Sequence, residues 1–283
     1  MQGTSREAQR ALREQLNQQL GGAGGPLDSA AAGRLSDDLF AVVSLFAGQG
    51  SLRRTLADPA LPVERKVELV DRLLSGKVSD PALEVVRAAG RQRWSEPRDV
   101  VDALEAVAVE AALTRAELDD QLDEVENQLF RFERILDAEP ALRAALTDRN
   151  LPGERKHALL DRLLEGKAAP VTRSLVERAV LFPRGRTIER VFAEFLRLAA
   201  ERRSRLIARV TSAVPLTDAQ QTALAAALAR EFGRDVRLQT IVDPAVVGGL
   251  AVRIGDEVLD GTVARQLDTA RRTLTGRSTG RSA

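Results

Sequence analysis

"LPVERKVELVDRLLSGK" occupies residues 61–77, and "LPGERKHALLDRLLEGK" occupies residues 151–167, ninety positions later. Over the wider windows 51–77 and 141–167, 16 of 27 positions are identical. A match of this extent indicates a duplication and not a chance likeness. Because each copy is long and only two are present, the pattern favours two helical bundles, or one fused bundle, over a solenoid of three or more short repeats.

The quoted stretch is typical of an amphipathic helix with both ends marked. Pro62 suits the first helical position, where its missing N–H costs nothing, and Gly76 is placed to cap the C-terminus. Pro152 and Gly166 repeat this design in the second copy. Five apolar residues of the first copy follow helical spacing and should share one face: Val63, Val67, Val70, Leu73 and Leu74.

A mostly uninterrupted helix is predicted between the copies, from about residue 97 to residue 137. Its apolar residues alternate spacings of four and three, which is a heptad-like stripe. Either the stripe packs against the protein's own helices and its acidic flank is solvated, or it forms a coiled-coil seam for another chain. The stripe consists of Leu118, Leu122, Val125, Leu129, Phe132 and Leu136, and the acidic flank consists of Glu117, Asp119, Asp120, Asp123, Glu124 and Glu126.

The pattern changes after about residue 205. "RLIARVTSAV" is rich in β-branched residues, and Thr217 then caps a predicted helix. "DVRLQTIVD" and "GGLAVRIGDEVLDG" alternate polar and apolar residues, as strands do. A last helix is expected over residues 262–274, before a tail that should be disordered. The predicted order is strand, helix, strand, strand, helix.

The fold class that follows is mainly α, with a duplicated helical bundle followed by a small C-terminal α/β domain. The predicted borders are residues 1–96 for the first bundle, 97–204 for the second, 205–275 for the α/β domain and 276–283 for the tail.

Composition excludes several classes of function. The chain has 283 residues, no cysteine and a single histidine, His157, so it has no disulfide or thiolate chemistry and little room for a histidine metal site. Its net charge of +1 gives no field typical of a nucleic-acid or membrane binder. The longest apolar stretches are too short to span a bilayer, and the start carries no signal-peptide core. We expect a cytosolic chain that reaches a membrane only through a partner.

No motif supports catalysis. "SGK" and "EGK" lack the earlier glycine and the following Ser or Thr of a phosphate-binding loop, and both end helices. Gly248 and Gly249 lack dinucleotide-binding spacing, so a hairpin or close-packing role is favoured over a ligand. His157 stands where the first copy has Val67 and is interpreted as a helix-surface residue. "PRGR" at residues 183–186 is interpreted as a solvated basic turn, with contact to an acidic partner as the alternative.

The C-terminal residues carry a resemblance to a known family. "VTSAVPLTDAQ" at residues 210–220 and "VDPAVVGGLAVRIGDEVLDGTVARQLDTARRTL" at residues 242–274 resemble the delta subunit of bacterial ATP synthase. The mitochondrial counterpart is the oligomycin-sensitivity-conferring protein. "LDEVENQLFRFERILDAEPALRAAL" and "LPGERKHALLDRLLEGK" are similar to that family's helical domain, so the resemblance covers about residues 97–274. The first copy is extra, as in the longer actinobacterial members.

The resemblance implies a non-catalytic stator subunit that joins the catalytic head of the rotary ATP synthase to its peripheral stalk and so resists torque. The implied partners are one or more alpha subunits of the head and the b-type stalk subunit, with the chain as a single copy in a hetero-oligomeric complex. Neither nucleic acid, a cofactor, a metal nor direct membrane insertion is expected, and the location is the cytoplasmic face of the plasma membrane. A regulatory adaptor that dimerises or binds a helix through the acidic stripe is the alternative.

Two sets of contact residues follow from the resemblance. A groove for an alpha-subunit helix is expected on two helices, although the same apolar faces could be plain bundle core. The stalk contact is expected near the Gly-Gly turn, on a strand that buries every second residue in its own sheet. The groove set is Val100, Leu104, Val107, Ala108, Leu175, Val176 and Ala179, and the stalk set is Val246, Val247, Gly248, Gly249, Leu250 and Val252.

Overall fold

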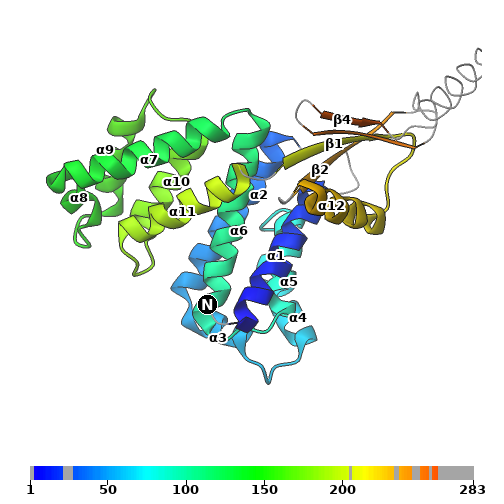
Figure 1. The fold of residues 1–283 in the computed structure, drawn as a ribbon. Helices are drawn as coiled ribbons and strands as arrows, with labels where there is room; N and C mark the ends of the chain where they lie inside the picture. Colours follow the sequence, from blue (N-terminus) through cyan, green and yellow to red (C-terminus); the bar gives the residue numbers. More distant parts are fainter. Residues whose placement is uncertain are drawn as a thin grey trace, which may run out of the picture. The chain divides into compact units, whose positions relative to one another are not determined.

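The computed structural model describes residues 3–21, 28–203, 206–232, 236–243, 249–254 and 257–260 (Figure 1). The chain divides into two compact units, Met1–Arg202 and Arg203–Ala283. The first is helical and the second contains a small sheet, so the predicted fold class is confirmed. The border expected between residues 96 and 97 falls inside the first unit and stays a prediction.

The helices of the first unit repeat in order. The helices α3, α4 and α5 each begin and end ninety residues before α8, α9 and α10, as the duplicated sequence predicts. The helices are α1 Gly3–Gly21, α2 Ser29–Gly48, α3 Gly50–Ala57, α4 Val63–Leu74, α5 Asp80–Arg91, α6 Pro97–Leu118, α7 Leu122–Ala138, α8 Pro140–Thr147, α9 Gly153–Leu164, α10 Pro170–Leu181 and α11 Ile188–Arg203.

Helix α6 belongs to both copies. It follows α5 as α11 follows α10, and it precedes α7 as α1 precedes α2. It contacts α1, α2, α3 and α5 of the first copy, and α7 and α10 of the second (Figure 1). Its middle is buried on all sides from Ala103 to Thr114, which agrees with an almost continuous run of apolar and small residues. One hydrophobic core therefore runs through both copies.

The duplicated helix ends are set by proline and glycine. Pro62 and Pro152 are N-caps with extended ψ angles of 143° and 141°, so the helices begin one residue later than predicted. Gly76 and Gly166 have φ angles of +70° and +66°, which only glycine adopts without strain. The predicted C-caps are thereby confirmed. Val63, at the start of α4, is 42% exposed, so the predicted apolar face is not buried along its whole length.

The long helix predicted between the copies is broken. It ends at Leu118 and restarts at Leu122, because Asp120 takes a left-handed conformation with φ +55° and the chain changes direction there. The stripe therefore lies on two helices. Its members on α7, which are Val125, Leu129, Phe132 and Leu136, are buried against the protein's own helices. For these four residues the prediction that the stripe packs against the protein's own helices is confirmed. They therefore cannot form the apolar coiled-coil seam that the adaptor alternative requires.

The second unit contains a mixed sheet in the order β2-β1-β3-β4. The strands are β1 Leu206–Ser212, β2 Val236–Val242, β3 Leu250–Ile254 and β4 Glu257–Asp260, and the helix α12 Asp218–Phe232 joins the parallel pair β1 and β2. Strand β3 pairs antiparallel with both β1 and β4. Thr217 and Gln220 cap the start of α12 reciprocally, as expected for a helix beginning there. The last predicted helix and the tail lie outside the described residues.

Candidate functional site

All seven predicted groove residues lie in the core of the helical unit. Four are on α6 and three are on α10, and the two helices contact each other, so the sequence correctly grouped them in one region. Each side chain is at most 1% exposed, and α2 packs against α6. Ser36 Oγ on α2 donates a hydrogen bond of 3.0 Å to the Ala108 carbonyl oxygen of α6. In this conformation α2 of the chain itself contacts α6, where a partner helix was expected.

The stalk set falls only partly within the described residues. Val246, Val247 and Gly248 lie outside them. Gly249 has φ +82°, which fits the turn predicted for the glycine pair. Val252 is 5% exposed and packs in the core of the second unit, whereas the neighbouring Arg253 is exposed, so the alternation predicted for this strand is confirmed there.

Three exposed apolar side chains lie near one end of β1 and β2. Val214, Ile241 and Val242 are 66%, 42% and 48% exposed. Ser212, the last residue of β1, pairs with Val242, and β2 is an edge strand of the sheet. We call these three residues the β2-edge surface. None of the three was predicted as a contact residue from the sequence. Two adjacent apolar residues at the end of a strand are the signal that could have found it, since a half-buried strand alternates.

The "PRGR" turn is neither solvated nor free for an acidic partner. Arg184 donates to Asp102 Oδ1 at 2.7 Å and also binds Glu105. Arg186 lies 2.7 Å from Glu105 Oε2. The Glu105 and Arg184 side chains are only 9% and 12% exposed. The prediction of a solvated turn was therefore wrong, because two carboxylates from α6 bind its cations and fasten the turn after α10 to that shared helix.

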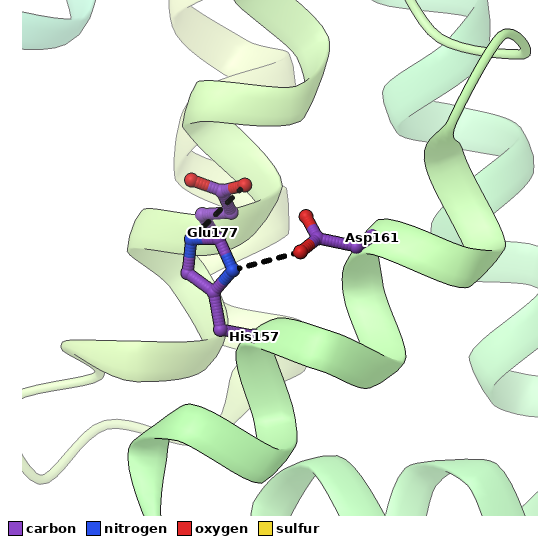
Figure 2. Close-up of side chains that lie close together, drawn as sticks. All are labelled: His157, Asp161 and Glu177. Atoms are coloured by element: carbon purple, nitrogen blue, oxygen red, sulfur yellow. Dashed lines mark hydrogen bonds and ion pairs between the residues drawn. The ribbon is translucent and has the colours of Figure 1, made fainter.

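His157 lies beside two carboxylates on the outside of the second copy (Figure 2). Its Nδ1 is 3.2 Å from Asp161 Oδ2 on α9, and its Nε2 is 3.7 Å from Glu177 Oε1 on α10. The side chain is 46% exposed, which confirms a helix-surface residue. One ligand atom from each of the three residues lies within 4.8 Å of the others, a spacing that a divalent cation could use.

Arg173 already neutralises these carboxylates. Its Nε donates to Glu177 Oε1 at 2.9 Å, and its Nη2 binds Asp161. The first copy ties the equivalent helices through Arg87 and Asp71, whose Nε and Oδ1 atoms are 2.6 Å apart. The cluster thus joins α9 to α10, as Arg87 and Asp71 join the equivalent helices of the first copy; we call it the helix tie of the second copy. A metal cation could bind there only by displacing the Arg173 guanidinium.

A surface pocket lies between α3 and the connection from α5 to α6. It has a volume of about 540 Å³, and Arg54, Thr55, Asp58 and Trp94 are among its lining residues. The Trp94 indole N–H donates to the Ala89 carbonyl oxygen at 2.9 Å and serves the fold. The lining offers no nucleophile paired with a base, so it does not indicate a catalytic site. Within the described ranges, no helix is both long and apolar enough to cross a bilayer.

The comparisons with known proteins agree with this architecture. The family described as "ATP synthase delta (OSCP) subunit" matches residues 109–274, more than half of the chain. The "ATP synthase subunit delta" of Streptomyces griseus is 46% identical over 276 residues, which cover 98% of this chain and 100% of the relative. That of Parafrankia is 47% identical over 97% of this chain and 100% of the relative. Since these relatives match almost end to end, they share the first copy, which precedes the family match.

A mitochondrial ATP synthase structure from Toxoplasma gondii contains a chain 21% identical to this one, covering 59% of this chain and 95% of that one with a TM-score of 0.28. A TM-score this low is no evidence of a shared fold. The sequence relatives decide the assignment. The chain belongs to the ATP synthase delta (OSCP) subunit family, whose members are non-catalytic components of the peripheral stalk linking the catalytic head to the stator.

Proposed function

We propose that this subunit clamps an alpha subunit of the catalytic head through its helical unit and the b-type stalk subunit through its α/β unit. As a single copy in the complex, at the cytoplasmic face of the plasma membrane, it would keep the head from turning with the central shaft. The observation that carries the proposal is the pairing of a helical unit with one continuous core and a small sheet with an exposed apolar edge.

The continuous core suits a part that must transmit torque. Helix α6 contacts helices of both copies, and Arg184 and Arg186 fasten the turn after α10 to it. A close-packed interior transmits strain instead of absorbing it. The helical unit should therefore behave as one stiff body between its two ends.

The stalk contact is assigned to the β2-edge surface together with residues 246–250. Val214, Ile241 and Val242 expose large apolar side chains, and residues 246–250 follow Ile241 and Val242 closely in the sequence. Val252 would act from within the sheet as support, because it is buried there. An apolar helix end from the stalk subunit is the partner that fits such a surface.

The head contact leaves two alternatives that one experiment separates. If the groove set receives an alpha-subunit helix, α2 must first leave α6, whereas a contact elsewhere leaves α2 in place. The chain has no native cysteine, so a disulfide engineered between α2 and α6, near Ser36 and Ala108, would be unique. Loss of alpha-peptide binding in the oxidised chain and its return on reduction would support the groove set. Binding unchanged by oxidation would place the head contact elsewhere.

Binding of the full-length chain to two peptides tests the proposal as a whole. One peptide carries the N-terminus of the alpha subunit and the other carries the C-terminal end of the stalk subunit. Val242→Asp should abolish binding of the stalk peptide and leave the alpha peptide unaffected. Ala227→Asp, at an exposed position of α12, is the matched control and should change neither. If the wild-type chain bound neither peptide, the proposed clamp would be contradicted.

A further inference from the structure

The pocket between α3 and the connection from α5 to α6 has a lining that the second copy does not repeat. We call it the α3 pocket; its lining residues are Ser51, Arg54, Thr55, Ala57, Asp58, Pro59, Trp94, Ser95 and Pro97. Ninety residues later, only the aspartate is retained, as Asp148. The core residues Leu52 and Leu56 of α3 are both retained, as Leu142 and Leu146 of α8. The two copies therefore share the core of this helix and differ in the pocket.

Three polar residues of α3 line the pocket, and α8 has alanine at all three equivalent positions. The polar residues are Ser51, Arg54 and Thr55, and the alanines are Ala141, Ala144 and Ala145. Arg54 is exposed, and within the part of the chain that the structure describes no carboxylate lies within 4 Å of its guanidinium. Its N–H groups are therefore available to a carboxylate or phosphate from outside the chain.

A buried lysine lies near the α3 pocket without a carboxylate partner. Lys66 of α4 is 3% exposed, and among the described residues no carboxylate oxygen lies within 4 Å of its Nζ. Burial lowers the pKa of Lys66, whereas the charge of the pocket residue Asp58 raises it. Arg93, which precedes Trp94 of the lining, lowers it further. Because a buried cation without an ion pair is costly, an anion bound in the pocket would stabilise Lys66.

The charges in and near the lining are mostly positive. The cations are Arg54, Lys66, Arg93 and Arg98, and the carboxylates are Asp58 and Glu96. Asp58 Oδ1 already accepts a hydrogen bond of 2.8 Å from the Ala60 N–H. The pocket is open to solvent, and Pro59, Trp94 and Pro97 form its apolar part. Small-molecule sites are usually enclosed and mostly apolar, so an open, cationic pocket fits an acidic side chain on a protein surface better.

We propose that the α3 pocket binds an acidic side chain of another ATP synthase subunit. Arg54 pairs with its carboxylate, and the apolar part of the pocket contacts the residue beside it. Hydrogen bonds between an arginine and a carboxylate are shorter and stronger than neutral ones, so this pair would fix the position of the partner segment. The pocket lies in the first copy and is separate from the groove set and from the β2-edge surface, so it goes beyond the proposed clamp and gives the extra copy a contact of its own.

Site-specific photocrosslinking in the purified, complete ATP synthase tests the pocket. p-Benzoylphenylalanine replaces Thr55, and the matched control replaces Ala145, its half-buried equivalent in the second copy. The Thr55 probe should crosslink to one Asp- or Glu-containing segment of another subunit, identified by mass spectrometry, and the Ala145 probe should not reach that segment. Adding Arg54→Glu should lower the Thr55 crosslink yield by about threefold or more, as expected for the loss of one ion pair. Arg10→Glu, at an exposed position of α1, should leave the yield unchanged.

Three results would overturn the inference: no crosslink from position 55, crosslinks from positions 55 and 145 to the same segment, or a yield that Arg54→Glu leaves unchanged. A free anion is the other ligand that the same donors could bind. Trp94 is the single tryptophan of the chain, so its fluorescence in the isolated full-length chain reports on the pocket. Inorganic phosphate should leave this fluorescence unchanged. A saturable change that Arg54→Glu abolishes would assign the pocket to a free anion and overturn the docking proposal.

Discussion

Ser36 and Ala108 are 72 residues apart in the chain, yet the Ser36 hydroxyl donates to the Ala108 carbonyl oxygen at 3.0 Å, in the contact between α2 and α6. The bond joins the first copy to the helix that both copies share. Ser36 is 3% exposed, and Ala108 is completely buried. Only a small side chain at position 36 allows this contact.

Ser36→Leu should therefore lower the free energy of unfolding by about 1–3 kcal/mol, because it overpacks the contact between α2 and α6. Ser36→Ala removes only the hydrogen bond and should cost about 1 kcal/mol. Urea unfolding measures both. Ser51→Leu, at an exposed position of α3, is the control and should stay within about 0.5 kcal/mol of the wild type. Equal effects at positions 36 and 51 would contradict a tight contact.

The sequence predicts those parts of the fold that depend on local chemistry. Glycine at positions 76 and 166 marks two helix ends because no other residue adopts a positive φ so readily. The break at Asp120 has no such signal. Its neighbours continue a heptad-like pattern, and a single aspartate in the left-handed region is tolerated wherever the tertiary fold requires a turn.

The site was less predictable, because its features depend on residues far apart in the chain. Arg184 reads as a solvated cation until Asp102 and Glu105, about eighty residues earlier, are brought against it. The apolar faces of α6 and α10 read equally well as a groove or as core, since periodicity identifies an apolar face but not what covers it. The cover on α6 is α2, from the extra copy.

Breaking the Arg184 cluster should destabilise the helical unit. Glu105→Gln removes the charge that Arg184 and Arg186 share, and in a site this buried the loss should cost about 3 kcal/mol. Glu68→Gln is the control, because its partner Arg65 is exposed and the pair should contribute less than about 1 kcal/mol. Thermal and urea unfolding of the full chain measure the difference. A Glu105→Gln variant as stable as Glu68→Gln would rule out the fastening role.

Gly166→Ala should lower the free energy of unfolding by about 1 kcal/mol, because alanine must adopt φ +66° at the end of α9. Gly153→Ala provides the control on the same helix. No atom lies within 4 Å of the added Cβ, and alanine favours the helix, so this variant should be neutral or more stable. Differential scanning calorimetry compares the two. A stabilising Gly166→Ala substitution would contradict the backbone geometry.

Glu133 and Glu194 should give opposite dependences of stability on pH. The pKa of Glu133 is raised by burial and by Asp137 and Glu189, so its ionised form costs stability at neutral pH. Glu133→Gln should therefore stabilise the chain at pH 7, by less than about 1 kcal/mol for a partly exposed group. The wild type should regain this difference as the pH falls through the folded-state pKa towards the ordinary value of 4.5.

Glu194 is the matched control, since a hydrogen bond from Arg197 lowers its pKa despite partial burial. Its contribution is present above the ordinary pKa and is lost as the pH falls through the lowered value. Glu194→Gln should destabilise the chain at pH 7, and the difference should vanish in acid. Urea unfolding between pH 3 and pH 8 follows both variants. If both substitutions changed the free energy of unfolding in the same direction at pH 7, the opposite pKa shifts of Glu133 and Glu194 would be refuted.

The helix tie of the second copy makes a prediction about metal ions. With Arg173 in place, Zn²⁺ should leave the Tm unchanged, because the guanidinium occupies Asp161 and Glu177. Arg173→Met frees three candidate ligands, and Zn²⁺ should then raise the Tm. Adding His157→Ala should abolish that rise. An equal response in the wild type would show that Arg173 does not control the cluster.

A cryo-EM map of the complete ATP synthase tests the clamp most directly. We predict that the helical unit lies against an alpha subunit at the top of the catalytic head, and that the α/β unit holds the b-type stalk at Ile241 and Val242. A map in which this subunit contacts the head but not the stalk, or the stalk but not the head, would contradict it.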